Sequence, residues 1–330
     1  IYKESALENN LDVLNYSELI KKYSWILERD HKCILSPDSD GLLCGLFMSN
    51  YLNWKVVGFY DGKILIKDKK IDLNECIFLD MEIFRDFIRS AGHHIVLYSQ
   101  RAIPELWTNL NQCIQPNLLR GYYGQTHFKN KYPLAMIHLL IGILDNQEKI
   151  NIETESICPL LFTDGTFKNL FNYPENCLSW LHYLGADRKS SALHKIFFNE
   201  CYTITSLMIA LKELFKVISQ DDYSDKIKIS TREGKIDGLQ KDNSYFRFDD
   251  NTWLKTENFL KYLSAKTKWN YIQDKWTKSD FDVFQFTKKS NKARVGIFRQ
   301  ILSENPLSMA QTSGNLIEYT IDPHNIFKNI

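Results

Sequence analysis

The stretch LSPDSDGLLCGLFMS, residues 35–49, sets two aspartates two positions apart where an apolar run ends and a helical pattern begins. Before them, KCILSP (32–37) is typical of a short buried strand, and DGLLCGLFMSNYLN (40–53) has apolar residues at helical spacing. Asp38 and Asp40 are therefore expected in a loop between a strand and a helix. Like charges this close repel each other unless protons or cations neutralise them.

Similar patterns continue along the N-terminal half of the chain. WKVVGFYD (54–61), ECIFLDM (75–81) and HHIVLYS (93–99) are strand-like runs, a helix is expected at about 133–147, and SICPLLFTD (156–164) is expected to be a further strand. Strands that alternate with helices predict an α/β fold, a parallel sheet flanked by helices. Ligands of such sheets bind at the carboxyl ends of the strands.

A second domain is expected after an acidic, polar stretch, QDDYSDK (220–226). The helix pattern before it, residues 204–220, is strongly amphipathic. Residues 227–252 suggest short strands with turns. We therefore predict a larger domain over 1–220 and a smaller, mixed α+β domain over 227–330 that binds substrate or a partner.

Composition excludes several classes of protein. The chain has 330 residues, of which 44% are hydrophobic and 25% charged, an ordinary globular profile, and its net charge of +1 gives no overall attraction to nucleic acid or membrane. Seven cysteines without a CxxC pair indicate reduced core thiols rather than disulfides or a zinc site. The apolar run at 134–144 is too short to span a bilayer. We expect a cytoplasmic protein that does not bind membranes.

Acidic and histidine side chains fall at the predicted strand ends. Two follow the first strand, one ends the third, a histidine pair opens the next, and one ends the last. Oxygen and imidazole ligands suit Mn²⁺ or Mg²⁺, so we predict a two-ion metal centre where these ends converge. The residues concerned are Asp38, Asp40, Asp80, His93, His94 and Asp164.

Each of these features also has a simpler explanation. The first two aspartates are also suited to a turn and helix N-cap, and a histidine pair is common at a strand edge. Asp164 is also an ordinary turn residue before a glycine. Glu82 is either a further ligand, a group behind the ligands, or a carboxylate in the first turn of a helix.

Four segments resemble, in order, the motifs of one protein family, the DHH phosphoesterases. SPDSDG resembles motif I, FLDME motif II, GHHIV the motif that names the family, and FTDGTF the aspartate segment of motif IV. Together they cover roughly residues 33–167. Among members of this family, the RecJ-like exonucleases are the most similar.

The resemblance implies a role for each matched residue. Asp38 would bind one metal ion, and Asp80 would bridge both ions and hold the catalytic water between them. His94 would contact the phosphate, with Arg101 and Lys131 as further candidates by position. The second ion would be bound by Asp40, His93 and Asp164.

Two positions depart from the family pattern. Ile34 stands where pyrophosphatases and oligonucleotide-degrading phosphatases of the family have a histidine, which RecJ-type enzymes also lack. This favours nucleic acid as the substrate. Gly92 stands in place of the aspartate of the DHH triplet, and no glycine-rich substrate-binding motif is visible towards the C-terminus.

A basic segment near the C-terminus offers a local nucleic-acid site. Residues 251–300 contain eleven Lys or Arg against four Asp or Glu, interleaved with aromatic residues. This mixture suits phosphate contact with base stacking, although lysines beside an aromatic core or a surface loop would give the same pattern. The candidate phosphate contacts are Lys288, Lys289, Lys292 and Arg294.

These observations predict a metal-dependent phosphodiesterase, a nuclease acting on single-stranded DNA or RNA. Two alternatives stay open. One is hydrolysis of small nucleotides, such as cyclic dinucleotides or short oligonucleotides. The other is a catalytically silent scaffold of the same fold that binds nucleic acid or a protein, and a protein partner or homo-oligomer is compatible with each.

Overall fold

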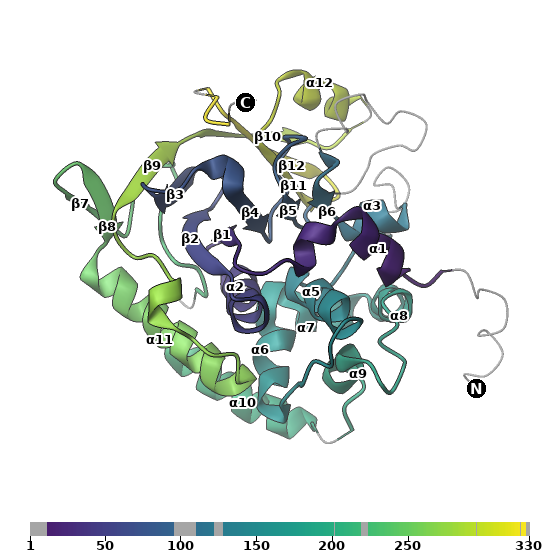
Figure 1. Ribbon diagram of the computed structural model, residues 1–330. Helices are drawn as coiled ribbons and strands as arrows, with labels where there is room; N and C mark the ends of the chain where they lie inside the picture. Colours follow the sequence, from purple (N-terminus) through teal and green to yellow (C-terminus); the bar gives the residue numbers. More distant parts are fainter. Residues whose placement is uncertain are drawn as a thin grey trace.

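A nine-stranded mixed sheet runs through the molecule in the order β6-β5-β4-β1-β2-β3-β9-β8-β7 (Figure 1). The computed structural model describes residues 12–95, 110–121, 128–200, 202–218, 224–294, 296–323 and 325–327. No helix in these ranges combines the length and apolarity needed to cross a membrane.

One half of the sheet is parallel, as the alternation of strands and helices predicts. β1 pairs with β2 on one side and with β4 on the other, and β5 and β6 continue in the same direction. The carboxyl ends of these strands therefore meet along one edge. The parallel strands are β1 (Lys32–Leu35), β2 (Lys55–Tyr60), β4 (Cys76–Leu79), β5 (Ser90–Ala91) and β6 (Cys113–Ile114).

The other half of the sheet is antiparallel, which the sequence patterns did not predict. β3 follows β2 after a short turn, and such a connection fixes an antiparallel pair. β9 then pairs with β3, and β8 and β7 extend the sheet from the C-terminal part of the chain. These strands are β3 (Ile64–Asp68), β7 (Leu239–Asp242), β8 (Tyr245–Phe248) and β9 (Phe281–Gln285).

Both faces of the parallel strands are buried. In β1, Cys33 and Leu35 pack in the larger hydrophobic cluster, whereas Ile34 packs in a second cluster on the opposite face. β4 alternates in the same way, with Ile77 and Leu79 on the first side. This explains why the sequences of these strands are continuous apolar runs rather than alternating apolar and polar residues.

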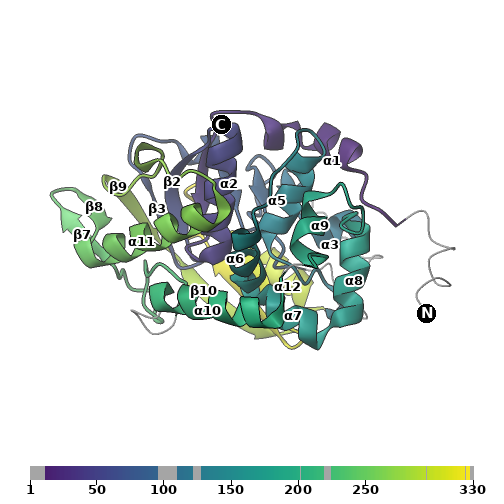
Figure 2. The same cartoon turned by 90° about the horizontal axis from the view of Figure 1, so that it is seen from below.

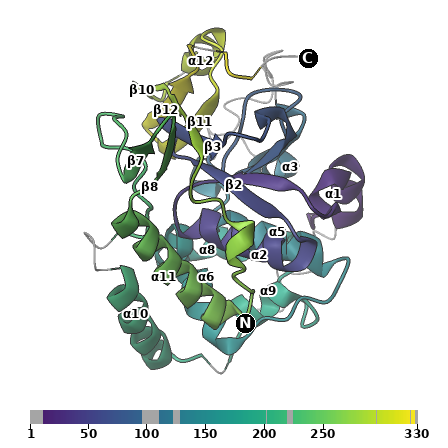
Figure 3. The same cartoon turned by 60° about the vertical axis from the view of Figure 1, so that its left-hand side comes forward.

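Helices cover one face of the sheet, as Figure 2 shows from their side. The turn after β1 leads directly into α2, which packs against α5 and α11. Figure 3 shows α10 and α11 side by side. The helices on this face are α2 (Ser39–Leu52), α5 (Met136–Asp145), α6 (Ile157–Phe162), α7 (Thr166–Asn172), α8 (Pro174–Tyr183), α9 (Ala192–Phe197), α10 (Ile204–Ile218) and α11 (Asp250–Thr267).

Three short helices complete this part of the fold. α1 (Tyr16–Lys22) and the 3-10 helix η1 (Ser24–Leu27) precede β1, and α3 (Pro116–Arg120) follows β6. Asn15 caps α1 by accepting a hydrogen bond from the Glu18 amide. The helices that the sequence predicts near 40–53, 133–147 and 204–220 are thus present, as α2, α5 and α10.

A separate three-stranded sheet lies on the other face, with α12 (Ile297–Ser303) beside it (Figure 1). Its order is β10-β12-β11, from β10 (Thr287–Lys292), β11 (Ser308–Ser313) and β12 (Leu316–Ile321). The Tyr60 and Ser308 hydroxyls lie 2.7 Å apart, and the Phe84 amide donates to the Leu307 carbonyl at 2.8 Å. These contacts attach the small sheet to the end of β2 and to the loop after β4.

One predicted strand is wrong, and a second does not begin at the predicted residue. Residues 156–164 form α6 and short 3-10 turns, because Pro159 cannot donate to a sheet ladder but is tolerated in the first turn of a helix. His93 and His94 do not open a strand but follow β5. The rest of that predicted strand, residues 96–99, lies outside the described residues.

The division into two domains at 220–227 stays a prediction. Strands from the second half of the chain continue the sheet of the first half, because β9 pairs with β3. The fold is therefore a mixed α/β sheet flanked by helices, with a smaller sheet besides.

Candidate metal centre

Asp38 and Asp80 lie in neighbouring loops at the carboxyl ends of β1 and β4. Leu35 pairs with Leu79 in the last register position of the two strands, so both loops start side by side. Asp38 caps α2 by accepting a hydrogen bond from the Gly41 amide at 3.2 Å. The N-cap explanation of Asp38 is thus confirmed, and its carboxylate lines a pocket as well.

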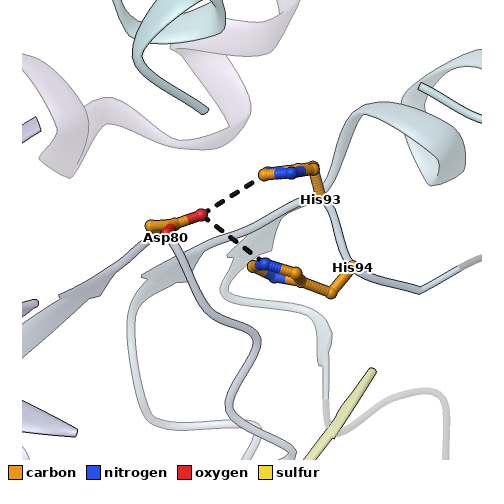
Figure 4. A group of neighbouring side chains, drawn as sticks. All are labelled: Asp80, His93 and His94. Atoms are coloured by element: carbon orange, nitrogen blue, oxygen red, sulfur yellow. Dashed lines mark ion pairs between the residues drawn. The ribbon is translucent and has the colours of Figure 1, made fainter. Parts of the chain in front are cut away.

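Asp80, His93 and His94 form a compact group (Figure 4). Asp80 Oδ1 lies 3.5 Å from His93 Nδ1 and 3.8 Å from His94 Nε2. One ligand atom from each residue lies within 4.8 Å of the other two, and the two imidazole rings stack with centroids 4.4 Å apart. Carboxylate and imidazole ligands at these separations can hold a divalent cation.

Two atoms of this group lack the partners that buried polar atoms need. Asp80 Oδ1 and His93 Nδ1 are buried and make no hydrogen bond. Most buried polar atoms in proteins have a hydrogen-bond partner, so two such atoms that face each other without one need an explanation. A cation between them would supply it, and the donor set therefore fits a divalent cation.

Charge repulsion at Asp80 points in the same direction. Burial raises the pKa of Asp80 well above its usual value, and the carboxylates of Asp40, Asp38 and Asp164 raise it further. The other three carboxylates are thus close enough to Asp80 to oppose its ionisation. Without a cation, ionising Asp80 here costs free energy.

Asp164 contacts His93 from the far side. Its Oδ2 lies 2.8 Å from His93 Nε2. Partial desolvation raises the pKa of Asp164, but the neighbouring His93, His94 and Lys131 outweigh this and lower the pKa. Asp164 lies in a 3-10 turn between α6 and α7, so the prediction that it ends a strand is wrong.

Asp40 has a structural contact that the sequence did not reveal. Its two carboxylate oxygens accept the backbone amides of Met136 at 2.6 Å and Ile137 at 3.0 Å. It therefore caps the N-terminus of α5, from a position 96 residues earlier in the chain. Burial and the nearby Asp164 and Asp38 raise the pKa of Asp40 to about 6, against the lowering effect of His93.

Glu82 is buried beside His94, outside any helix. Its carboxylate accepts the His94 amide at 2.6 Å and lies 3.2 Å from His94 Nδ1. Burial lowers the pKa of His94, but Glu82 outweighs it and raises the pKa to about 9. The interpretation of Glu82 as a first-turn helix carboxylate is therefore wrong.

A pocket of about 230 Å³ opens beside the metal-binding group. It lies between the strand-end loops and the small sheet, and Ser308, Thr320 and Glu318 form its far wall. The predicted residues Asp38, Asp80, His94 and Lys288 all line it. Lys226, which the sequence reading did not select, lines it too.

The other predicted substrate contacts are spread over different places. Lys289 lies on the opposite face of β10 and pairs with Glu304 at 2.6 Å. Lys292 and Arg294 are exposed at the end of that strand. Lys131 lies near Asp164. Burial lowers the pKa of Lys131, and the charge of Asp164 offsets only part of this effect. Arg101 lies outside the described residues.

Comparison with known proteins adds no relative. No family model matches the chain, and no match is found among curated proteins or solved structures. The resemblance to DHH phosphoesterases therefore rests on the four sequence motifs alone.

Proposed function

We propose that this chain is a metal-dependent phosphodiesterase that hydrolyses single-stranded DNA or RNA, using two Mn²⁺ or Mg²⁺ ions. The observation that carries the proposal is a pair of buried atoms without a hydrogen bond, Asp80 Oδ1 and His93 Nδ1, which face each other at 3.5 Å beside a pocket lined by Lys288. The four motifs resembling DHH phosphoesterases support the reaction class. A cytoplasmic location is part of the proposal, because the six described cysteines are free thiols.

The chain's own residues would divide the work as follows. Asp80 would bind metal at the carboxyl ends of the strands, and Asp38 adds a second carboxylate to the wall of the pocket. Lys288 supplies positive charge to a phosphate in the pocket. When bound, divalent cations lower the pKa of a water and neutralise charge that develops on the phosphate.

The test of the metal centre is Asp80→Asn, which keeps the shape of the side chain. Asparagine tolerates the positive φ of 63° at this position, so the fold should persist. We expect Mn²⁺ binding and hydrolysis to be lost, while the melting temperature of the metal-free protein stays the same or rises because repulsion is relieved. Calorimetry measures Mn²⁺ binding, thermal unfolding measures the melting temperature, and a nuclease assay measures hydrolysis. Activity near that of the wild type would contradict the assigned centre.

The substrate class is tested with a panel in Mn²⁺. It contains single-stranded DNA and RNA, a linear dinucleotide, a cyclic dinucleotide and pyrophosphate. We expect the single strands to be degraded fastest. A protein that binds Mn²⁺ and single strands but cleaves nothing in the panel would be the silent scaffold instead.

The size of the pocket favours small nucleotides as a second candidate substrate. Its volume of about 230 Å³ is below the range of about 300–1,000 Å³ typical of ligand sites, and the small sheet closes one side. It would take one end of a substrate rather than the middle of a strand. Turnover of the dinucleotides alone in the panel would establish this candidate.

A further inference from the structure

Two carboxylate–histidine pairs flank Asp80 in the same way. Asp164 holds His93 by Nε2, at 2.8 Å, which leaves Nδ1 facing Asp80. Glu82 holds His94 by Nδ1, at 3.2 Å, which leaves Nε2 facing Asp80. In each pair, the carboxylate engages one ring nitrogen and directs the other towards the same oxygen, Asp80 Oδ1.

Glu82 also fixes the backbone that carries His94. One of its oxygens accepts the amides of His94 at 2.6 Å and Ile95 at 3.2 Å, and the side chain is 1% exposed. On the other side of the same residue, the Gln311 amide donates to the His94 carbonyl at 2.8 Å. The backbone of His94 is thus held from both sides. Because Glu82 also contacts His94 Nδ1, it fixes the orientation of the imidazole ring.

Gly92 provides the space for this carboxylate. A Cβ at position 92 would lie 2.7 Å from Glu82 Oε2 and 2.6 Å from the Met81 carbonyl carbon, closer than such atoms approach. Any side chain there would push Glu82 away from His94. The departure from the DHH triplet at Gly92 and the buried Glu82 are thus two parts of one arrangement.

We propose that Glu82 is a positioning residue of the metal centre, and that it makes His94 a metal ligand together with Asp80 and His93. Carboxylates behind ligating histidines commonly fix the ring and its tautomer in this way. The inference rests on the proposed metal centre, but not on the substrate. It gives His94 a different partner from the phosphate that the family resemblance implies.

Glu82→Gln separates positioning from packing, because glutamine has nearly the same shape as glutamate. If its amide oxygen accepts the His94 and Ile95 amides, its NH₂ group faces His94 Nδ1 and favours a proton on Nε2, which blocks ligation. If the amide is turned over, its NH₂ group faces two backbone N–H groups. Neither orientation reproduces the carboxylate.

The experiment is a double-mutant cycle read by Mn²⁺ calorimetry, with Glu82→Gln, His94→Ala and the double variant. We expect Glu82→Gln to weaken Mn²⁺ binding by about 10- to 100-fold, and to have no further effect in the His94→Ala background. Glu75→Gln, at the opposite end of β4, is the matched control and should bind like the wild type. Equal losses in both backgrounds would make Glu82 a direct ligand and overturn the proposal, as would unchanged affinity.

A second measurement needs neither bound metal nor catalysis. In ¹H–¹⁵N imidazole spectra of the metal-free protein, the Nδ1 proton of His94 should exchange slowly in the wild type and lose this protection in Glu82→Gln. Protection that is the same in both proteins would overturn the proposal. If both measurements agree with the proposal but no phosphodiester is cleaved, the proposed function is wrong and this inference is still supported. If the wild type binds no Mn²⁺, both the metal centre and this inference are wrong.

Discussion

Asp80 and Asp164 both occupy the left-handed region of backbone conformation, with φ of 63° and 50°. Such conformations cost free energy for residues other than glycine, and they cluster at functional sites. Here the backbone turns both carboxylates towards His93. The strained backbone of Asp80 and Asp164 and the buried atoms without a hydrogen bond thus lie within the same small group of residues, which favours a site over ordinary turns.

His138 is the residue whose charge should limit stability in acid. Burial lowers the pKa of this histidine to about 3, whereas in the unfolded chain it is about 6.5. Protons therefore bind the unfolded chain first as the pH falls below 6.5, and stability is lost between about pH 6.5 and pH 3. At pH 5 this group alone should cost about 2 kcal/mol relative to neutral pH.

Glutamine at 138, which does not titrate, isolates this contribution. Denaturant unfolding of the metal-free wild type and of His138→Gln should show a shallower loss of unfolding free energy below pH 6.5 in the variant. Other titrating groups affect both proteins equally, so the difference between the two slopes belongs to His138. Parallel curves would mean that His138 is already charged, or not buried, in the native protein.

The alternation of side chains along β10 separates two neighbouring lysines. Lys288 lies 3.2 Å from Glu318 and lines the pocket beside the metal centre. Lys289 points to the other face, where Glu304 pairs with it. The four basic residues that the sequence groups together therefore do not form one surface, because successive residues of a strand face opposite ways.

Substitution of these two lysines should have different effects. We expect Lys288→Ala to weaken single-strand binding and to reduce the slope of log affinity against log salt by about one, since one phosphate contact is lost. Lys289→Ala should change neither quantity. Binding titrations at several salt concentrations measure the affinity and its slope. Equal effects of the two variants would indicate that an extended basic surface binds the strand.

At the scale of the whole molecule, the C-terminal part of the chain completes the core of the N-terminal part. β9 covers the edge of β3, and α11 packs on α2. Trp269 and Trp276 are buried in the same hydrophobic cluster as the first strand. The pocket, too, has walls from both parts, since Asp80 and Thr320 both line it.

We therefore expect residues 1–226 not to fold alone. Without the C-terminal part, β3 becomes an exposed edge and the cluster loses two of its tryptophans, Trp269 and Trp276. Denaturant unfolding of the shortened chain, followed by circular dichroism, should show no cooperative transition. A cooperative transition together with Mn²⁺ binding like that of the full chain would support the two-domain division at 220–227.

Local patterns in the sequence were sufficient for most of the parallel half of the fold. Apolar runs bounded by polar residues marked β1, β2 and β4, and helical spacing marked α2, α5 and α10. These signals arise because each element buries a face whose period is set by its own geometry. The positions of Asp38 and Asp80 followed directly, since both come at the ends of such strands.

Tertiary packing alone decided the rest. The apolar run at 156–164 has no clear strand or helix period; Pro159 disfavours a strand, and burial of the segment in the larger cluster completes α6. Asp40 caps a helix 96 residues away, and Glu82 reaches His94 across the space left by Gly92. Local periodicity in the sequence does not predict such contacts, because they depend on how helices, strands and loops pack against one another rather than on any one element.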